Sequence, residues 1–222
     1  MGTRTYEVTI TGKTPLLMHF DNIEWADQMD AWKDSAENQK GSKKGDDRSP
    51  AWRWLRCLYH DGHQLVIPSD NIAVCMREGG AMVPVPGGKS GKTFKSQSQS
   101  GMMSIEPEWP LLIDGKPVAA EKILALSKEN DFAKHKAVCE KFGFMLFVKR
   151  AKIGQAKHVR VRPRFDRWEI RGTIAVTDEQ ITEKVLNQIL EYSGKYKGLC
   201  DWRPGAPKPG PHGMFSATVK QV

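Results

Sequence analysis

The chain has 222 residues, a hydrophobic content of 39% and a formal net charge of +8 at pH 7. This length and content are typical of a globular protein with a sizeable core, and they exclude a disordered chain. No run of about 18 apolar residues is present, so we expect no membrane-spanning helix. The N-terminus lacks the apolar core of a signal peptide, and the four scattered cysteines form no C-x-x-C pair, so we expect reduced thiols in a cytoplasmic protein.

Taken in chain order, the spacing of apolar residues predicts both strands and helices. The predicted strands are 5–12, 65–68, 111–113, 143–150, 168–176 and 213–221. The predicted helices are 21–36, 51–56, 70–79, a helical region that ends near 141, and 178–193. We expect Asp21 with Glu24, and Thr177 with Gln180, to cap the first and last helices. Residues 84–101 lack apolar periodicity and predict a long flexible loop.

The positive charge is concentrated in residues 149–171, which hold nine Lys and Arg residues and only two acidic residues. Within this stretch, valines alternate with Arg160 and Arg162, which is the period of a strand with one apolar and one basic face. Like charges at that spacing repel one another, so the basic face needs an anionic partner. Because arginine binds phosphate bidentately, we interpret the row as a surface for a nucleic-acid backbone. The alternative is a solvated charged hairpin.

The predicted nucleic-acid-binding residues lie in three segments: the basic hairpin, a lysine-bearing loop and a Gly/Pro-rich loop near the C-terminus. They are Arg150, Lys152, Lys157, Arg160, Arg162, Arg164, Arg167 and Arg171 of the hairpin, Lys89, Lys92 and Lys95 of the lysine loop, and Trp202 and Arg203 of the Gly/Pro-rich loop. We expect the lysine loop to close over a bound strand. The tryptophan either stacks on a base or anchors its loop to the core, and the sequence leaves both open.

The order of the principal elements is strand, helix, strand, strand, helix, strand, which is the βαββαβ arrangement of ferredoxin-like (RRM-like) α+β domains. Residues 20–67 and 81–140 would be helical and loop insertions in a single domain that spans residues 1–222. We expect an antiparallel sheet that includes the segment 143–150 and has one face free of helices.

Three features resemble the RAMP superfamily, whose best-known members are RNA-binding backbone subunits of CRISPR effector complexes. They are the opening strand that ends in GKTPLLMH (12–19), the basic hairpin, and a loop with Gly194, Gly198, Gly205, Gly210 and Gly213 before the last strand. The TPLLMH opening and the RPRF hairpin are also similar to those of small phage-borne proteins of that shape. The resemblance implies a non-catalytic binder of single-stranded RNA or DNA, either a CRISPR-related subunit of a ribonucleoprotein complex or a phage relative.

Two other functions remain open on the sequence. Related endoribonucleases of the superfamily use a histidine as general acid or base, so the resemblance makes His19 a candidate for metal-independent RNA cleavage. The third possible function is that of a structural subunit, whose basic face would contact an acidic protein in a larger assembly.

A single domain offers few phosphate contacts, so we expect a homo-oligomer, a filament of copies along one strand. Exposed Trp52, Trp54 and Trp109 in the insertions would supply head-to-tail contacts.

We expect no cofactor and no metal. The sequence PGGKSGKT (86–93) departs from the phosphate-binding P-loop at Pro86, and no helix is predicted after it. Cys57, His60 and His63 have ligand chemistry, but they straddle a predicted turn and lack a second ligand pair.

Overall fold

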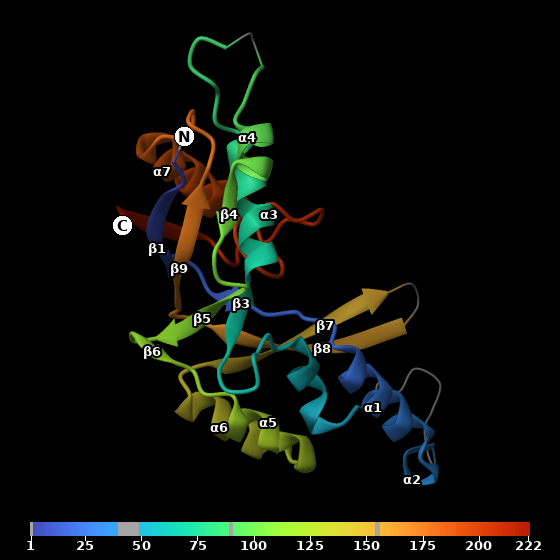
Figure 1. Cartoon of the computed structure of the whole chain (residues 1–222). Coiled ribbons are helices and arrows are strands. Elements are labelled where there is room, and N and C mark those ends of the chain that lie inside the picture. Colours follow the sequence, from blue (N-terminus) through green and yellow to red (C-terminus); the bar gives the residue numbers. More distant parts are fainter. Residues whose placement is uncertain (1, 40–48, 89–90, 154–155) are drawn as a thin grey trace.

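The computed structural model describes residues 2–39, 49–88, 91–153 and 156–222, which form an α+β protein with antiparallel sheets of seven and three strands (Figure 1). The strands are β1 Arg4–Gly12, β2 Leu16–Leu17, β3 Val66–Pro68, β4 Met102–Ser104, β5 Glu108–Ile113, β6 Lys116–Pro117, β7 Met145–Ile153, β8 Ala156–Phe165, β9 Glu169–Val176 and β10 Phe215–Gln221. The helices are α1 Ile23–Asp34, α2 Ala36–Gln39, α3 Ser69–Gly80, α4 Lys95–Ser100, α5 Glu121–Leu124, α6 Phe132–Lys141 and α7 Glu183–Tyr192, with 3-10 turns η1 Ala51–Cys57 and η2 Ala125–Lys128 and a π turn η3 Ser193–Lys197. None of the helices described is long and apolar enough to cross a membrane.

The larger sheet is built around β1, which pairs with β10 on one side and β9 on the other. The far edge of β9 pairs with β4 along one half and with β5 along the other, and β3 and β6 flank β5. Tyr6, Val8 and Ile10 of β1 are each 1% exposed, whereas Glu7 and Thr11 are exposed. This alternation confirms the predicted half-buried first strand.

Helices α3 and α7 pack together against the buried face of this sheet (Figure 1). Their close approach depends on Gly79, because a Cβ there would overlap the Ser193 hydroxyl and press on the Ile189 carbonyl. The opposite face carries exposed polar side chains such as Glu7 and Arg171.

Strands β7 and β8 form a ribbon that projects from the body of the molecule, and β2 joins it at its base (Figure 1). The prediction that residues 143–150 lie in the core sheet was wrong, since β7 pairs with β8 in the separate three-stranded sheet. The place beside β9 is taken by β4 and β5. The apolar side chains at the start of the ribbon pack into the core beneath it. There the ring of Phe144 stacks on the ring of Phe165, with centroids 4.8 Å apart.

The predicted caps of two helices were wrong. Asn22 caps α1, accepting a hydrogen bond from the backbone N–H of Glu24, because the predicted cap Asp21 pairs with Arg56 instead. Helix α7 begins later than expected, and Thr182 caps it by accepting from the N–H of Val185.

Part of the predicted flexible loop is helical. Helix α4 packs on the C-terminal end of α3, where Ser98 lies so close to Gly80 that no Cβ would fit. The side chain of Ser98 is 4% exposed, so packing rather than an apolar pattern holds this helix.

The insertion tryptophans are not the exposed contact residues that we predicted. Trp54 and Trp109 are fully buried, and their indole N–H groups donate to His135 Nδ1 at 2.9 Å and to the Ser104 hydroxyl at 2.7 Å. Trp52 is half-buried and packs at a tilt against the ring of Trp25. Any head-to-tail contact must therefore use other residues.

The Trp109 ring lies on the backbone of Gly172, and a Cβ at that position would overlap the ring. We expect Gly172→Ala to lower the free energy of unfolding by about 1–3 kcal/mol, because a fully buried indole would have to move. Denaturant titration measures this, with Thr218→Ala on the exposed side of β10 as a control that changes stability by less than about 0.5 kcal/mol. Equal stability of Gly172→Ala and the parent protein would contradict the contact.

Candidate nucleic-acid interface

The pairing of β7 with β8 places cations and an aromatic ring on one face of the ribbon. Lys149 lies opposite Arg160, Phe147 opposite Arg162, and Met145 opposite Arg164, and directly paired residues share a face. We call these six side chains the ribbon surface. On the other face Val161 is 5% and Leu146 8% exposed, whereas Val148 is 44% exposed, so only part of that face turns inward. The predicted alternation of valine and arginine is confirmed for Arg160, Val161 and Arg162.

The loop between Gly198 and Gly213 folds onto the ribbon surface. The rings of Trp202 and His212 stack with centroids 5.0 Å apart, and Phe147 packs against both at 6.5 and 6.0 Å. The Lys149 ammonium lies 3.2 Å from the centroid of the Trp202 ring, within cation–π range. Trp202 therefore anchors its loop and stays half-buried beside Lys149, while Arg164 lies 6.0 Å from the centroid of the Phe147 ring.

The backbone of this loop is strained at two positions on either side of Asp201. Cys200 has φ 61° and Trp202 has φ 49°, the left-handed region that non-glycine residues rarely adopt. Gly210 leaves room for the Trp202 ring, since a Cβ at position 210 would overlap that ring. The strained turn aims the Asp201 carboxylate at β8.

There the Asp201 carboxylate forms an ion pair with the guanidinium of Arg162. The two side chains are only 23% and 14% exposed. Burial lowers the pKa of Arg162 below its ordinary value, which is the direction expected for a cation removed from water. A buried guanidinium needs a counter-anion, and Asp201 supplies it.

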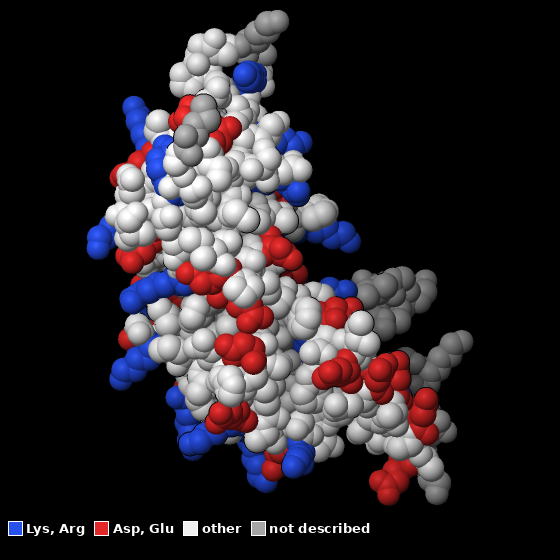
Figure 2. Space-filling view, viewed as in Figure 1, with Lys and Arg blue, Asp and Glu red and all other residues white. Residues whose placement is uncertain are grey.

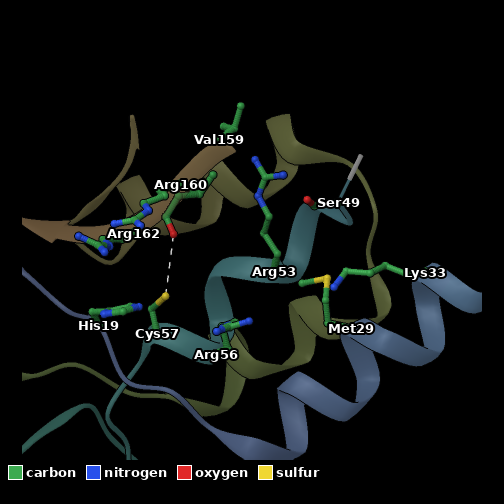
Figure 3. A pocket seen from close by; sticks show the side chains of 11 residues that line it. His19, Met29, Lys33, Ser49, Arg53, Arg56, Cys57, Val159, Arg160 and Arg162 are labelled. Atoms are coloured by element: carbon green, nitrogen blue, oxygen red, sulfur yellow. Dashed lines mark hydrogen bonds between the residues drawn. The ribbon is translucent and has the colours of Figure 1, made fainter. Parts of the chain in front are cut away.

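A pocket of about 390 Å³ lies beside this pair, between β8, η1 and α1 (Figure 3). In the described part of the chain its lining contains five Lys and Arg side chains and no carboxylate. The cations are Lys33, Arg53, Arg56, Arg160 and Arg162. Figure 3 shows that they come from both walls, Arg53 and Arg56 from η1 and Arg160 and Arg162 from β8. We call it the cationic pocket.

His19 also lines the cationic pocket, just after β2. Burial and the neighbouring Arg162 lower the pKa of its imidazole, which favours the neutral form. Cys57 lies at the pocket floor as a buried thiol that contacts the Val161 carbonyl at 3.9 Å, and burial raises its pKa to about 11. This thiol is a packing group rather than a nucleophile.

Several predicted arginines lie away from the cationic pocket and are paired. Arg164 pairs with Asp166 at 2.6 Å while staying on the ribbon surface. Arg167 pairs with Asp114 at 3.0 Å, and Arg171 lies on the open face of the larger sheet beside Glu169. Arg203 is 20% exposed and pairs with Glu78 of α3, which makes it a structural residue.

The lysine loop is not brought to the ribbon. Lys95 is the first residue of α4 and Lys92 shortly precedes it, at the opposite end of α3 from the ribbon (Figure 1), and Lys89 lies outside the described residues. The backbones of Arg150, Lys152 and Lys157 belong to the ribbon, but their side chains lie outside the part that the structure describes.

Sequence reasoning missed half of the cationic pocket. Lys33, Arg53 and Arg56 belong to an insertion, and only the tertiary fold brings them to β8. His212 was also missed, although its place in the glycine-rich loop could have drawn attention to it. Among residues 2–39, 49–88, 91–153 and 156–222, no group of three His, Cys, Asp or Glu side chains could hold a metal ion.

The two histidines of the site predict a pH dependence. Burial lowers the pKa values of both His19 and His212, and nearby cations lower them further. A bound polyanion would raise both pKa values, so the complex takes up protons. Affinity should therefore increase as pH falls below the histidine pKa values of the complex. The increase should level off once pH is below the pKa values of the free protein. For each histidine, the total gain in affinity should be roughly tenfold per unit by which binding raises its pKa.

Titrations of a single-stranded oligonucleotide at constant salt, from about pH 8 to about pH 5, measure this effect. We expect His19→Gln and His212→Gln each to reduce the dependence, whereas His63→Gln, at an exposed residue beside Glu121, leaves it unchanged. An affinity that does not vary with pH in the parent protein would contradict the placement of phosphate beside these imidazoles.

Comparison with known proteins gives no relative from which a function could be transferred. No known family model matches this chain, and no curated protein is significantly similar to it. The function is therefore argued from the ribbon surface and the cationic pocket.

Proposed function

We propose that this protein binds single-stranded nucleic acid, RNA or DNA, on the ribbon surface and in the adjoining cationic pocket, without a chemical step. The observation that carries this proposal is the described lining of the pocket, with five cations and no carboxylate. Three of these cations are paired with acids that lie outside that lining: Lys33 with Asp30, Arg56 with Asp21, and Arg162 with Asp201. A concave site of one charge sign attracts the opposite charge, and a phosphate backbone supplies it repeatedly.

The mixture of rings and cations favours a single strand over a duplex. Lys149 of the ribbon surface lies over Trp202 of the adjoining loop, and Arg164 lies beside Phe147, so cations and rings are neighbours. Single strands are bound by such interleaving, because unpaired bases stack on rings while cations take the phosphates. A base that stacks on Trp202 would replace the Lys149 ammonium, which would then be free to meet a phosphate.

We also infer that the larger sheet with α3 and α7 is a ferredoxin-like core. The strand order β10-β1-β9, followed by β4 and β5, supports this, with β4 and β5 as a split second core strand. The β7–β8 ribbon would then be an insertion between the second and third core strands of one domain. That arrangement supports the resemblance to the RAMP superfamily and a role as a phage-borne or CRISPR-related cytoplasmic protein.

A pair of arginine variants tests the binding proposal. We expect Arg160→Ala to weaken binding of all sequences alike by about tenfold, because phosphate contacts position a strand without reading it. The slope of log affinity against log salt should fall by about 0.7 for each lost contact with a single strand. Arg171→Ala, at a residue that is also exposed but lies on the larger sheet beside Glu169, should leave both quantities unchanged. Equal losses in the two variants would show that binding follows the overall charge and would contradict a site on the ribbon.

His19 favours a second candidate, metal-independent RNA cleavage, because a neutral imidazole borders the phosphate pocket. The described residues offer its ring no hydrogen-bond partner to orient it, which is why we rank binding first. Labelled RNA from the same titrations, run on a denaturing gel with chelator present, distinguishes the two. Products that disappear with His19→Gln would make the protein an enzyme.

We propose further that several copies line up along one strand, as a homo-oligomer or within a ribonucleoprotein complex. The ribbon surface covers only a handful of nucleotides, and neighbours in contact would recover affinity. Helix α1 supplies a contact surface, since Ile23 is 76% exposed and the nearby Phe20 40% exposed. Acidic side chains gather around α1 and α2 (Figure 2), and they complement the cations of a neighbouring ribbon.

Binding to strands of increasing length tests assembly. We expect occupancy to rise in steps with length and to be cooperative, and we expect Ile23→Asp to remove the cooperativity while affinity for a short oligomer stays the same. Met103→Asp, at a 60% exposed residue of β4, is the matched control. One copy bound at every length, counted by mass photometry, would leave a monomeric binder.

A further inference from the structure

A second, smaller pocket shares His19 with the cationic pocket. It has a volume of about 200 Å³ and lies between the residues after η1, the first turn of α3 and the strained turn at Asp201. Its polar lining is mixed, because Tyr59, Asn71 and Asp201 offer neutral or acceptor groups, while Arg203 also lines it and is paired with Glu78. The ion pair joins the two pockets, since Arg162 lines the first and Asp201 the second.

Some hydrogen-bond donors and acceptors that line this pocket have capacity for further hydrogen bonds. The Tyr59 hydroxyl donates to the His19 carbonyl at 3.2 Å, so its oxygen still accepts. The Nδ2 of Asn71 is buried and makes no hydrogen bond of standard geometry with a described group. It is nevertheless close enough to the Tyr59 hydroxyl to oppose the rise in pKa that burial causes there. Because the amide and the hydroxyl do not hold each other in a hydrogen bond of standard geometry, the Asn71 N–H donor and the Tyr59 oxygen are both placed to meet a ligand.

We propose that this pocket holds one base of the bound strand and prefers a base with an exocyclic amino group. The inference rests on the proposed function, because it needs a phosphate in the cationic pocket. With the phosphate beside Arg162, the base of the same nucleotide reaches past His19 into the smaller pocket. A volume of about 200 Å³ is below the roughly 300–1,000 Å³ of drug-sized ligand sites, which suits a single base.

The lining chemistry selects among bases. The Asp201 carboxylate accepts hydrogen bonds and keeps free lone pairs after pairing with Arg162, and an amino group supplies the matching donor. The Asn71 amide donates, and the ring nitrogen next to the amino group of cytosine accepts. Uracil presents the reverse pattern at both positions, a carbonyl and an N–H. Cytosine should therefore bind better than uracil, although the two bases are alike in size.

The experiment compares oligo(C) and oligo(U) of about 12 nucleotides, a length within the range of one small binding fold, at one salt concentration. We expect the parent protein to bind oligo(C) roughly tenfold more tightly. Asn71→Asp replaces the donor with an acceptor and should abolish this ratio. Asp70→Asn, at the neighbouring exposed residue of α3, is the matched control and should keep it. The ratio is the readout, because an added carboxylate weakens both affinities alike.

The outcomes separate the two proposals. Equal binding of both oligomers by the parent protein, still weakened by Arg160→Ala, would overturn the base pocket and leave the binding function intact. A ratio that survives Asn71→Asp would also overturn the pocket, provided that thermal melting shows the variant folded. Failure of the parent protein to bind either oligomer would overturn the proposed function together with the pocket.

Discussion

The ion pair between Arg162 and Asp201 is the interaction on which the interface depends, because it joins β8 to a loop that follows α7. Removing one partner of a buried pair typically costs about 3–5 kcal/mol, since the other charge is left without compensation. Any turn that left Asp201 away from β8 would leave Arg162 without its counter-anion, so the pair favours the strained turn at Cys200 and Trp202, where the strain is about 1–3 kcal/mol at each left-handed residue. In return the loop holds the Trp202 ring under the Lys149 ammonium in the free protein. A surface ordered before binding loses less conformational entropy when its ligand arrives.

Part of the fold could be predicted, because β1 alternates and helices α3 and α7 have a clear apolar stripe. The first strand and the basic strand follow directly from period-two patterns, as Tyr6 and Arg160 illustrate. The segment around Phe144 could not be placed, since a run that is apolar on both faces fits any buried position. The cap of α1 was also ambiguous: Asp21 and Asn22 are adjacent and both are good caps, and only the tertiary pairing of Asp21 with Arg56 decides between them.

For the candidate site, the basic strand could be predicted from the sequence, whereas the segments that surround this strand could not. Charge density identified the basic row, but a count of cations cannot tell Arg160, which is exposed at the pocket, from Arg203, which Glu78 neutralises. The same count grouped Lys95 with the ribbon, although α4 holds it at the far end of α3. Burial of Trp54 was hidden as well, because its partner His135 lies 81 residues later in the chain. In each case the missing information is a contact between segments distant in sequence.

The two sheets have different structural roles, and this explains why the cations gather on the ribbon. On the open face of the larger sheet Arg171 pairs with Glu169 and Lys220 lies opposite Glu7, so these charges are balanced. The larger sheet instead fixes the base of the ribbon, since β1 leads through a short turn into β2, which pairs with β8. A projecting ribbon can be lined by segments on several sides, and here η1, α1 and the loop at Asp201 all reach it. A flat sheet with one face buried can be approached by other segments only on its open face, so the cations gather on the ribbon.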